Sequence, residues 1–110
     1  MTKEEYQEFV KEGASNAYNA ESAIIAIVEE VGEVCGLIKK KLIYPNYDFK
    51  AKKGYTFEEG VLDEMGDVLW QYLNLCNYLE LDINDIINHN LEKLNNRHGG
   101  IKTSLDGGKR

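Results

Sequence analysis

The sequence predicts a single all-α domain that resembles a four-helix bundle. Apolar residues recur at helical spacing over long segments, capping motifs precede two of these segments, and no segment alternates as a strand does. The sequence contains no internal repeat or low-complexity tract. A chain of 110 residues can form only a modest core, so we expect it to assemble as a homo-oligomer, a homodimer or a homotetramer.

The first half of the chain predicts two helices. A capping box of Thr2 and Glu5 opens the first helix. The second follows a cap at Asn16 or Asn19 and covers residues 20–42. We expect its apolar positions to face inward: Ile24, Ile27, Val28, Val31, Val34, Cys35 and Ile38.

The second half predicts a loop and two further helices. Residues 44–55 contain the only proline and are rich in Lys and Tyr, which indicates an exposed loop. A second capping box, formed by Thr56 and Glu59, opens a helix that runs to residue 79. Its inward positions are Val61, Leu62, Met65, Val68, Leu69, Tyr72, Leu73, Leu75, Cys76 and Leu79.

Asp82 caps the last predicted helix, residues 83–97, and Gly99 and Gly100 end it. We therefore predict a helical domain over residues 1–98 and a flexible tail over residues 99–110.

Charge and composition limit the possible partners. A net charge of −6 argues against nucleic acid and anionic membranes, but it allows a small anion that arrives with its own metal ion. The N-terminus is polar, unlike a signal peptide, and no apolar run approaches the roughly 20 residues of a membrane span. Cys35 and Cys76 lie in apolar helical contexts, which predicts buried reduced thiols and a cytoplasmic location.

Two pairs of acids are the strongest chemical signal. Glu30 and Glu33 lie three residues apart in the second predicted helix, and Glu64 and Asp67 are spaced identically in the third. This spacing puts both acids of a pair on one face of a helix. Two such helices side by side would direct four carboxylates at one point, where they repel unless a cation lies among them. Mg²⁺ prefers oxygen ligands of this kind, and Mn²⁺ is possible.

The alternative for each pair alone is a solvated helix face. Two observations favour a site. Both pairs lie beside the apolar stripes of the two most apolar helices, and each pair encloses a glycine, Gly32 or Gly66. Glycine in a helix interior costs about 1 kcal/mol relative to alanine, so we expect close helix contact or space for a ligand there.

The last helix carries Asn90, Lys93 and Arg97 on one face with Ile86. The two cations could extend along the apolar surface with their charges in water. Alternatively, they bind phosphate groups, and Asn90 donates a hydrogen bond to a sugar or phosphate oxygen.

These motifs resemble those of the MazG-like nucleoside triphosphate pyrophosphohydrolases. Residues 29–33, Glu-Glu-Val-Gly-Glu, are similar to that family's E-E-x-x-E motif, and residues 64–67, Glu-Met-Gly-Asp, to its E-x-x-D motif. Asn90, Lys93 and Arg97 resemble the family's closing helix. The resemblance covers most of the chain, although the segment between the acidic motifs is long.

The resemblance implies Mg²⁺-dependent hydrolysis of a (d)NTP to (d)NMP and pyrophosphate, in a homo-oligomer with sites near subunit contacts. Carried over by position, Glu30, Glu33, Glu64 and Asp67 are the metal ligands and catalytic residues, and Glu29 is a further acid of the motif. Lys93 and Arg97 would hold the phosphate tail. The base would stack on an aromatic residue, for which the candidates are Trp70, Tyr18 and Tyr72.

The same acids do not fit two other classes of metal site. A di-iron carboxylate bundle needs Glu-x-x-His pairs, and neither His89 nor His98 has Glu three residues earlier. The acidic loop of an EF-hand is also missing. Three alternatives stay open: a nucleotide-binding module without turnover, a helical dimerisation module, and a related hydrolase of dUTP or phosphoribosyl-ATP.

Overall fold

The computed structural model describes residues 1–14 and 19–98, and these residues form helices joined by short turns, without a strand. The predicted all-α class is confirmed. The described helices are α1 (Lys3–Gly13), α2 (Ala20–Ile43), α3 (Phe49–Lys53), α4 (Phe57–Tyr78) and α5 (Ile83–His98). The predicted tail, residues 99–110, lies outside the described residues. No helix in residues 1–14 and 19–98 combines the length and apolar character needed to cross a membrane.

The predicted capping boxes fix where the helices begin. The Thr2 hydroxyl accepts a hydrogen bond from the Glu5 amide at 3.1 Å, and the Glu5 carboxylate accepts one from the Thr2 amide at 2.8 Å. Thr56 and Glu59 repeat this arrangement at the start of α4, with distances of 3.1 Å and 2.7 Å. Asn19 caps α2. Each cap satisfies amide groups that a helix start leaves without a partner.

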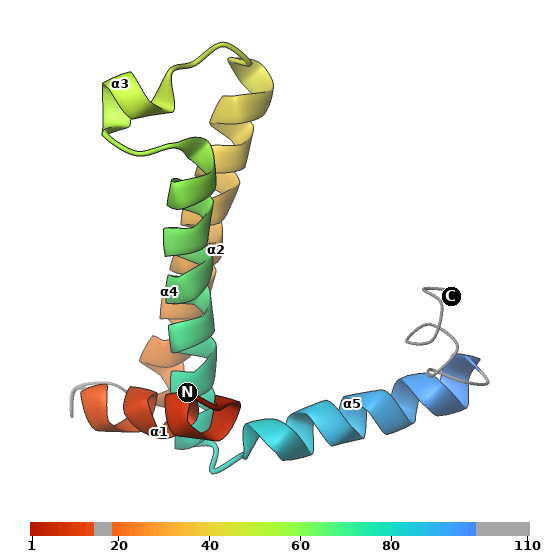
Figure 1. Ribbon diagram of the computed structural model, residues 1–110. Coiled ribbons are helices and arrows are strands. Elements are labelled where there is room, and N and C mark those ends of the chain that lie inside the picture. The colour runs from red at the N-terminus through yellow and green to blue at the C-terminus, as the bar shows by residue number, and fades with distance from the viewer. Residues whose placement is uncertain (15–18, 99–110) are drawn as a thin grey trace.

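The centre of the fold is an antiparallel pair formed by α2 and α4 (Figure 1). Their register is visible at Gly60, which is buried. A Cβ atom added there would lie 2.8 Å from the Tyr55 ring and 3.3 Å from the Leu37 side chain. The helices are therefore in close contact at this level because residue 60 lacks a side chain.

The segment predicted as a loop contains a short helix, so the prediction for residues 44–55 was incomplete. Asp48 caps α3, and Phe49 is 4% exposed. The Phe49 ring packs against those of Tyr47 and Phe57, with centroids 4.8 Å and 5.5 Å away. This aromatic cluster fixes the connection across the end of the α2–α4 pair. A five-residue helix has too few positions to show a periodic pattern.

At the opposite end, α1 crosses α4 and forms the small core of the molecule. Val10 of α1 packs with Leu73 and Cys76 of α4, and all three side chains are buried. Cys76 is thus buried as predicted. Burial raises the pKa of its thiol, which keeps it protonated and unreactive at neutral pH.

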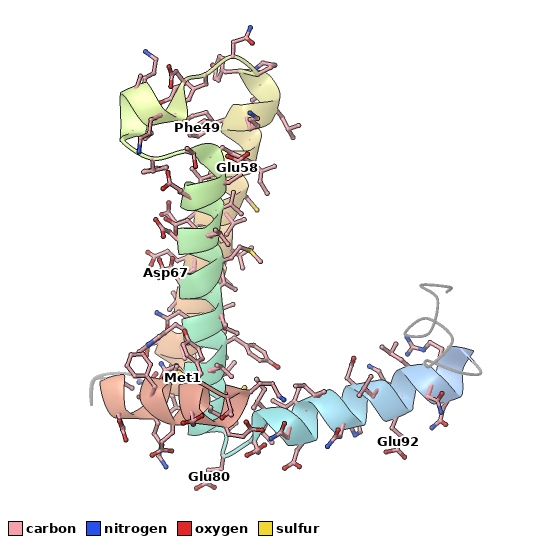
Figure 2. All side chains as sticks on the ribbon, in the orientation of Figure 1. Met1, Phe49, Glu58, Asp67, Glu80 and Glu92 are labelled. Atoms are coloured by element: carbon pink, nitrogen blue, oxygen red, sulfur yellow. The ribbon has the colours of Figure 1, made fainter. Side chains whose placement is uncertain are left out.

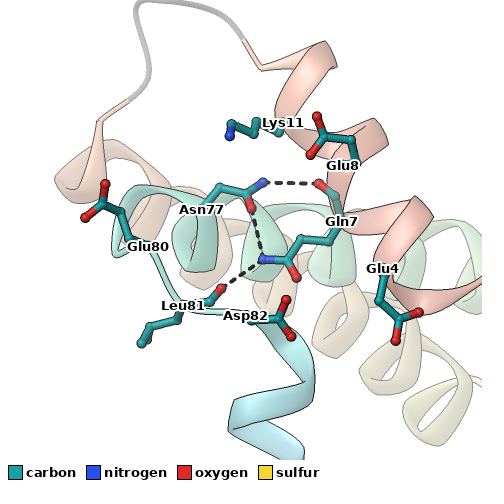
Figure 3. A pocket seen from close by; sticks show the side chains of 8 residues that line it. All are labelled: Glu4, Gln7, Glu8, Lys11, Asn77, Glu80, Leu81 and Asp82. Carbon is teal, nitrogen blue, oxygen red and sulfur yellow. Dashed lines mark hydrogen bonds between the residues drawn. The ribbon is translucent and has the colours of Figure 1, made fainter.

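One glutamine joins α1 to the turn between α4 and α5 (Figure 3). The Gln7 amide group donates to the Asn77 side chain and to the Leu81 carbonyl, both at 2.9 Å. Its oxygen accepts from the Ile83 amide at 3.0 Å. Within this turn Glu80 has a φ of 57°, a left-handed conformation that few non-glycine residues adopt. These features set the direction in which α5 leaves the turn.

A single chain does not close into the predicted four-helix bundle. Figure 1 shows α5 extending away from the α2–α4 pair, so that the molecule is L-shaped. The radius of gyration is 17.5 Å, against about 13 Å for a compact domain of this size. Away from its two ends, the α2–α4 pair is not covered by any other described helix (Figure 1).

The prediction that the apolar stripes of α2 and α4 face inward is therefore only partly correct. Cys35, predicted to be buried, is exposed. The exposed apolar side chains of these helices include Ile24, Ile25, Val28, Val31, Ile38, Leu42, Leu62, Met65, Leu69 and Tyr72. These side chains stay exposed because α2 and α4 pack on each other along one side only, and α1 contacts only one end of α4. We call this set the outer apolar face.

Candidate active site

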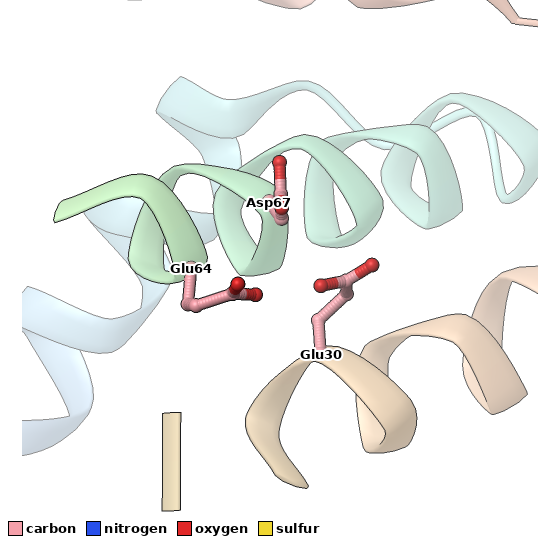
Figure 4. A group of neighbouring side chains, drawn as sticks. All are labelled: Glu30, Glu64 and Asp67. Carbon is pink, nitrogen blue, oxygen red and sulfur yellow. The ribbon is translucent and has the colours of Figure 1, made fainter. Parts of the chain in front are cut away.

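Three of the predicted acids converge between α2 and α4 (Figure 4). Glu30 of α2 and Glu64 and Asp67 of α4 each offer one carboxylate oxygen, and these oxygens lie within 4.8 Å of one another. Glu64 and Asp67 are one turn apart on α4, so they share a face, and the antiparallel α2 brings Glu30 opposite them. Glu30 and Glu64 are half-buried, whereas Asp67 is exposed.

All three side chains of the cluster are acidic, so their charges are of one sign. Burial raises the pKa of Glu30, and the carboxylates of Asp67, Glu64 and Glu29 raise it further. Among the described residues no Lys or Arg side chain acts on Glu30 to oppose this shift. The three acids therefore repel one another at neutral pH, and a cation between them would relieve the repulsion.

The donor set fits a hard divalent cation. All three groups are carboxylates, and Mg²⁺ and Mn²⁺ prefer such oxygen ligands. Zinc sites are built mainly from His and Cys, and neither residue is in the cluster. Three oxygens at this spacing can bind one cation and leave positions for water or phosphate oxygens.

Glu33, the fourth predicted ligand, is exposed on α2 and is not part of this cluster. It follows Glu30 by one turn, and its role as a ligand stays a prediction. Glu29 is also exposed and acts on Glu30 through its charge. At Gly32 and Gly66 we expected close helix contact or space for a ligand. A Cβ atom added at either position would meet nothing within 4 Å, so a single chain shows open space there and no close contact.

The predicted phosphate-binding residues lie on a different part of the molecule. Asn90, Lys93 and Arg97 are exposed on α5. Figure 2 shows Asp67 midway along α4 and Glu92 towards the far end of α5, which leads away from the carboxylates. A single chain does not bring these residues to its own acidic cluster, because the turn at Glu80 directs α5 outward.

The aromatic candidates differ in their surroundings. Trp70 is half-buried and packs against the core of Val10, Leu73 and Cys76. Tyr72 is exposed on α4. Tyr18 lies outside the described residues. Stacking of a base on any of these rings stays a prediction.

Two polar residues beside the cluster were not predicted as functional. Gln71 and Asn74 follow Glu64 and Asp67 on α4. In the part of the chain that the structure describes, each has a buried side-chain atom without a hydrogen-bond partner, Oε1 of Gln71 and Nδ2 of Asn74. Their positions on the polar line of α4 are visible in the sequence. Their lack of partners depends on the packing and could only be found in the structure.

Comparison with known proteins agrees with this geometry. The sequence model of one protein family, the MazG nucleotide pyrophosphohydrolase domain, matches residues 18–101. These residues include both helices of the acidic cluster and all of α5. No curated protein and no solved structure matches the chain significantly. The matched segment covers well over half of the sequence and carries both acidic motifs. The chain therefore belongs to the MazG nucleotide pyrophosphohydrolase family.

Proposed function

We propose that this protein is a Mg²⁺-dependent nucleoside triphosphate pyrophosphohydrolase, which cleaves a (d)NTP to the (d)NMP and pyrophosphate. The observation that supports this most directly is the convergence of Glu30, Glu64 and Asp67 within 4.8 Å. Family membership alone gives the class of reaction, whereas the cluster gives the chain a place at which the reaction can occur.

Glu30, Glu64 and Asp67 would hold the Mg²⁺ ion, with Mn²⁺ as a substitute and Glu33 as a further ligand. A bound cation neutralises charge on the phosphate oxygens and makes its water ligands more acidic. One of these carboxylates orients the attacking water in line with the bond between the α-phosphorus and the leaving pyrophosphate.

The rest of the site comes from a second copy of the chain. The outer apolar face is too large for a stable monomer surface, and α5 leads away from its own carboxylates. In a homodimer or homotetramer, the Lys93 and Arg97 side chains of one chain can neutralise the phosphate tail bound by another. Asn90 would donate to a phosphate or sugar oxygen.

The test is pyrophosphate release from a panel of dNTPs and NTPs in the presence of Mg²⁺. We expect Glu30→Gln and Asp67→Asn each to lower turnover by at least about a hundredfold, because each removes a charge from the cation site. Asp63→Asn is the matched control, since Asp63 is exposed on the same helix outside the cluster. It should leave turnover unchanged.

Full activity of both cluster variants would contradict the proposed site. If the wild-type protein binds a non-hydrolysable analogue in calorimetry but releases no pyrophosphate, it is a nucleotide-binding protein without turnover, and the proposed reaction is wrong.

A further inference from the structure

We propose that Gln71 and Asn74 are substrate-positioning residues that hydrogen-bond the nucleoside part of the substrate. This inference rests on the proposed function, since it extends the site from the phosphates to the nucleoside.

The first argument is register. Seven residues make close to two helical turns, so Gln71 and Asn74 repeat the positions of Glu64 and Asp67 two turns further along α4. On the antiparallel α2, the residue two turns from Glu30 in the same direction is Ala23. The contact between Leu37 and Gly60, two turns from the cluster in the opposite direction, shows that the helices keep this register. The two amides and Ala23 therefore lie at the same height along the helix pair, about 10 Å from the carboxylates.

The second argument is that each of these two side-chain amides leaves one hydrogen-bonding atom unused within the described residues. Asn74 is 1% exposed, yet among residues 1–14 and 19–98 its Nδ2 atom has no acceptor and Oε1 of Gln71 has no donor. A buried polar group without a partner destabilises the folded state. Asn77, one turn further along α4, shows the contrast, since its side chain both accepts from and donates to Gln7. The fold thus satisfies Asn77 and leaves Gln71 and Asn74 with one unused group each.

The third argument is the opposite wall. Ala23 is fully buried and Ala26 is half-buried, and neither side chain offers a polar group. The side chain of each alanine is a single methyl group. Separating the helices here therefore exposes little apolar area to water. Insertion of a ligand at this level costs less free energy than at the aromatic cluster around Phe49.

The chemistry of the two unused groups points to the occupant. Nδ2 of Asn74 donates and Oε1 of Gln71 accepts, and a nucleoside has acceptors and donors on its sugar and on the edge of its base. A triphosphate tail has acceptors only, so it cannot satisfy Gln71. With the α-phosphate at the carboxylates, the nucleoside would extend along α4 towards the two amides.

The experiment is calorimetry with Mg²⁺ and two kinds of probe. One is the non-hydrolysable α,β-imido analogue of each dNTP, and the other is inorganic tripolyphosphate, which lacks a nucleoside. The variants are Asn74→Leu and Gln71→Met, which replace each amide by an apolar side chain of similar length. Asn77→Leu is the matched control, because it removes an asparagine that is already hydrogen-bonded within the fold.

We expect the wild-type protein to bind at least one analogue more tightly than tripolyphosphate. Asn74→Leu should weaken analogue binding roughly ten- to a hundredfold and leave tripolyphosphate binding within about twofold. Its thermal midpoint should not fall, because the variant removes a buried group without a partner. Asn77→Leu should lower the midpoint and keep the preference for the analogue.

The outcomes separate the two proposals. If the wild-type protein binds neither probe, the proposed function fails and this inference fails with it. If it binds both probes and the preference survives in both Asn74→Leu and Gln71→Met, the inference alone is wrong. Loss of stability in both variants with an unchanged preference would assign the amides a purely structural role.

Discussion

At the residue scale, Glu30 is the acid of the cluster whose pKa is raised by burial and by the neighbouring carboxylates. It comes from α2, whereas the two acids opposite come from α4, so it closes the cluster across the helix pair. Its raised pKa shows that the fold holds this carboxylate where its charge is unfavourable. An acid of this kind is retained at a cost to stability, which is typical of functional sites.

The first prediction from this residue concerns stability without divalent ions. Because folding raises the pKa of Glu30, its contribution to the free energy of unfolding is present at acid pH and is lost as the pH rises through the folded-state pKa. In EDTA at pH 7–8, Glu30→Gln should therefore raise the thermal midpoint, and the gain should shrink as the pH falls through the raised folded-state pKa of Glu30. Differential scanning calorimetry over pH 4–8 measures this change.

Adding Mg²⁺ should reverse the order of the two proteins. The wild-type midpoint should rise, because the ion binds the folded state only, and the Glu30→Gln midpoint should hardly move. Equal stabilisation of both proteins by Mg²⁺ would mean that the ion binds elsewhere.

The sequence predicted the cluster because helical spacing alone puts Glu64 and Asp67 on one face. It did not distinguish Glu30 from Glu33, which are both acids on the same helix. That choice depends on the register of α2 against α4, and the register depends on contacts such as that between Leu37 and Gly60. A pattern of neighbouring residues does not predict a contact between residues that are distant in the sequence.

At the element scale, the first residues of α1 and α4 were predictable because their caps are local hydrogen bonds. Thr2 and Thr56 each bond an amide three residues later, and such motifs are legible in the sequence. The direction of α5 was not predictable. It depends on a left-handed glutamate at position 80, a conformation that non-glycine residues seldom adopt, and on a glutamine more than seventy residues earlier.

A second prediction concerns that glutamine. Gln7→Leu should lower the free energy of unfolding by about 2–4 kcal/mol, because it leaves the Leu81 carbonyl and the Ile83 amide without their partner. Urea titration followed by circular dichroism measures the loss. Hydrogen exchange at the Ile83 amide should also accelerate, since α5 is then less firmly attached.

Glu8→Ala is the control for the glutamine variant. Glu8 lies next to Gln7 on α1 and is exposed, so its removal should change stability by no more than about 0.5 kcal/mol. A similar loss in both variants would indicate a general weakness of α1 and not the hydrogen bonds of Gln7.

At the scale of the whole molecule, the outer apolar face supports the proposal that the chain assembles with copies of itself. The expected homo-oligomer follows from this surface as well as from the modest length of the chain. Val28 and Leu62 are good probes of the face, because they are 68% and 73% exposed and contribute little to packing within the chain.

We expect Val28→Asp combined with Leu62→Asp to shift the protein to monomers in sedimentation velocity, because a charge in a buried apolar interface is strongly unfavourable. The monomer should keep its helical content. Lys52→Asp, on the exposed side of α3, makes a similar charge change outside the face and should leave assembly intact. A wild-type protein that is monomeric at all concentrations would contradict the expectation.

The outward direction of α5 has a consequence for how the protein would behave in a cell. If a neighbouring chain supplies the cations for each set of carboxylates, two encounters are required, one between chains and one with the nucleotide. Output would then rise faster than in proportion to the amount of protein made. A sparse population of chains would leave the nucleotide pool almost untouched, and a modest increase in synthesis would turn hydrolysis on.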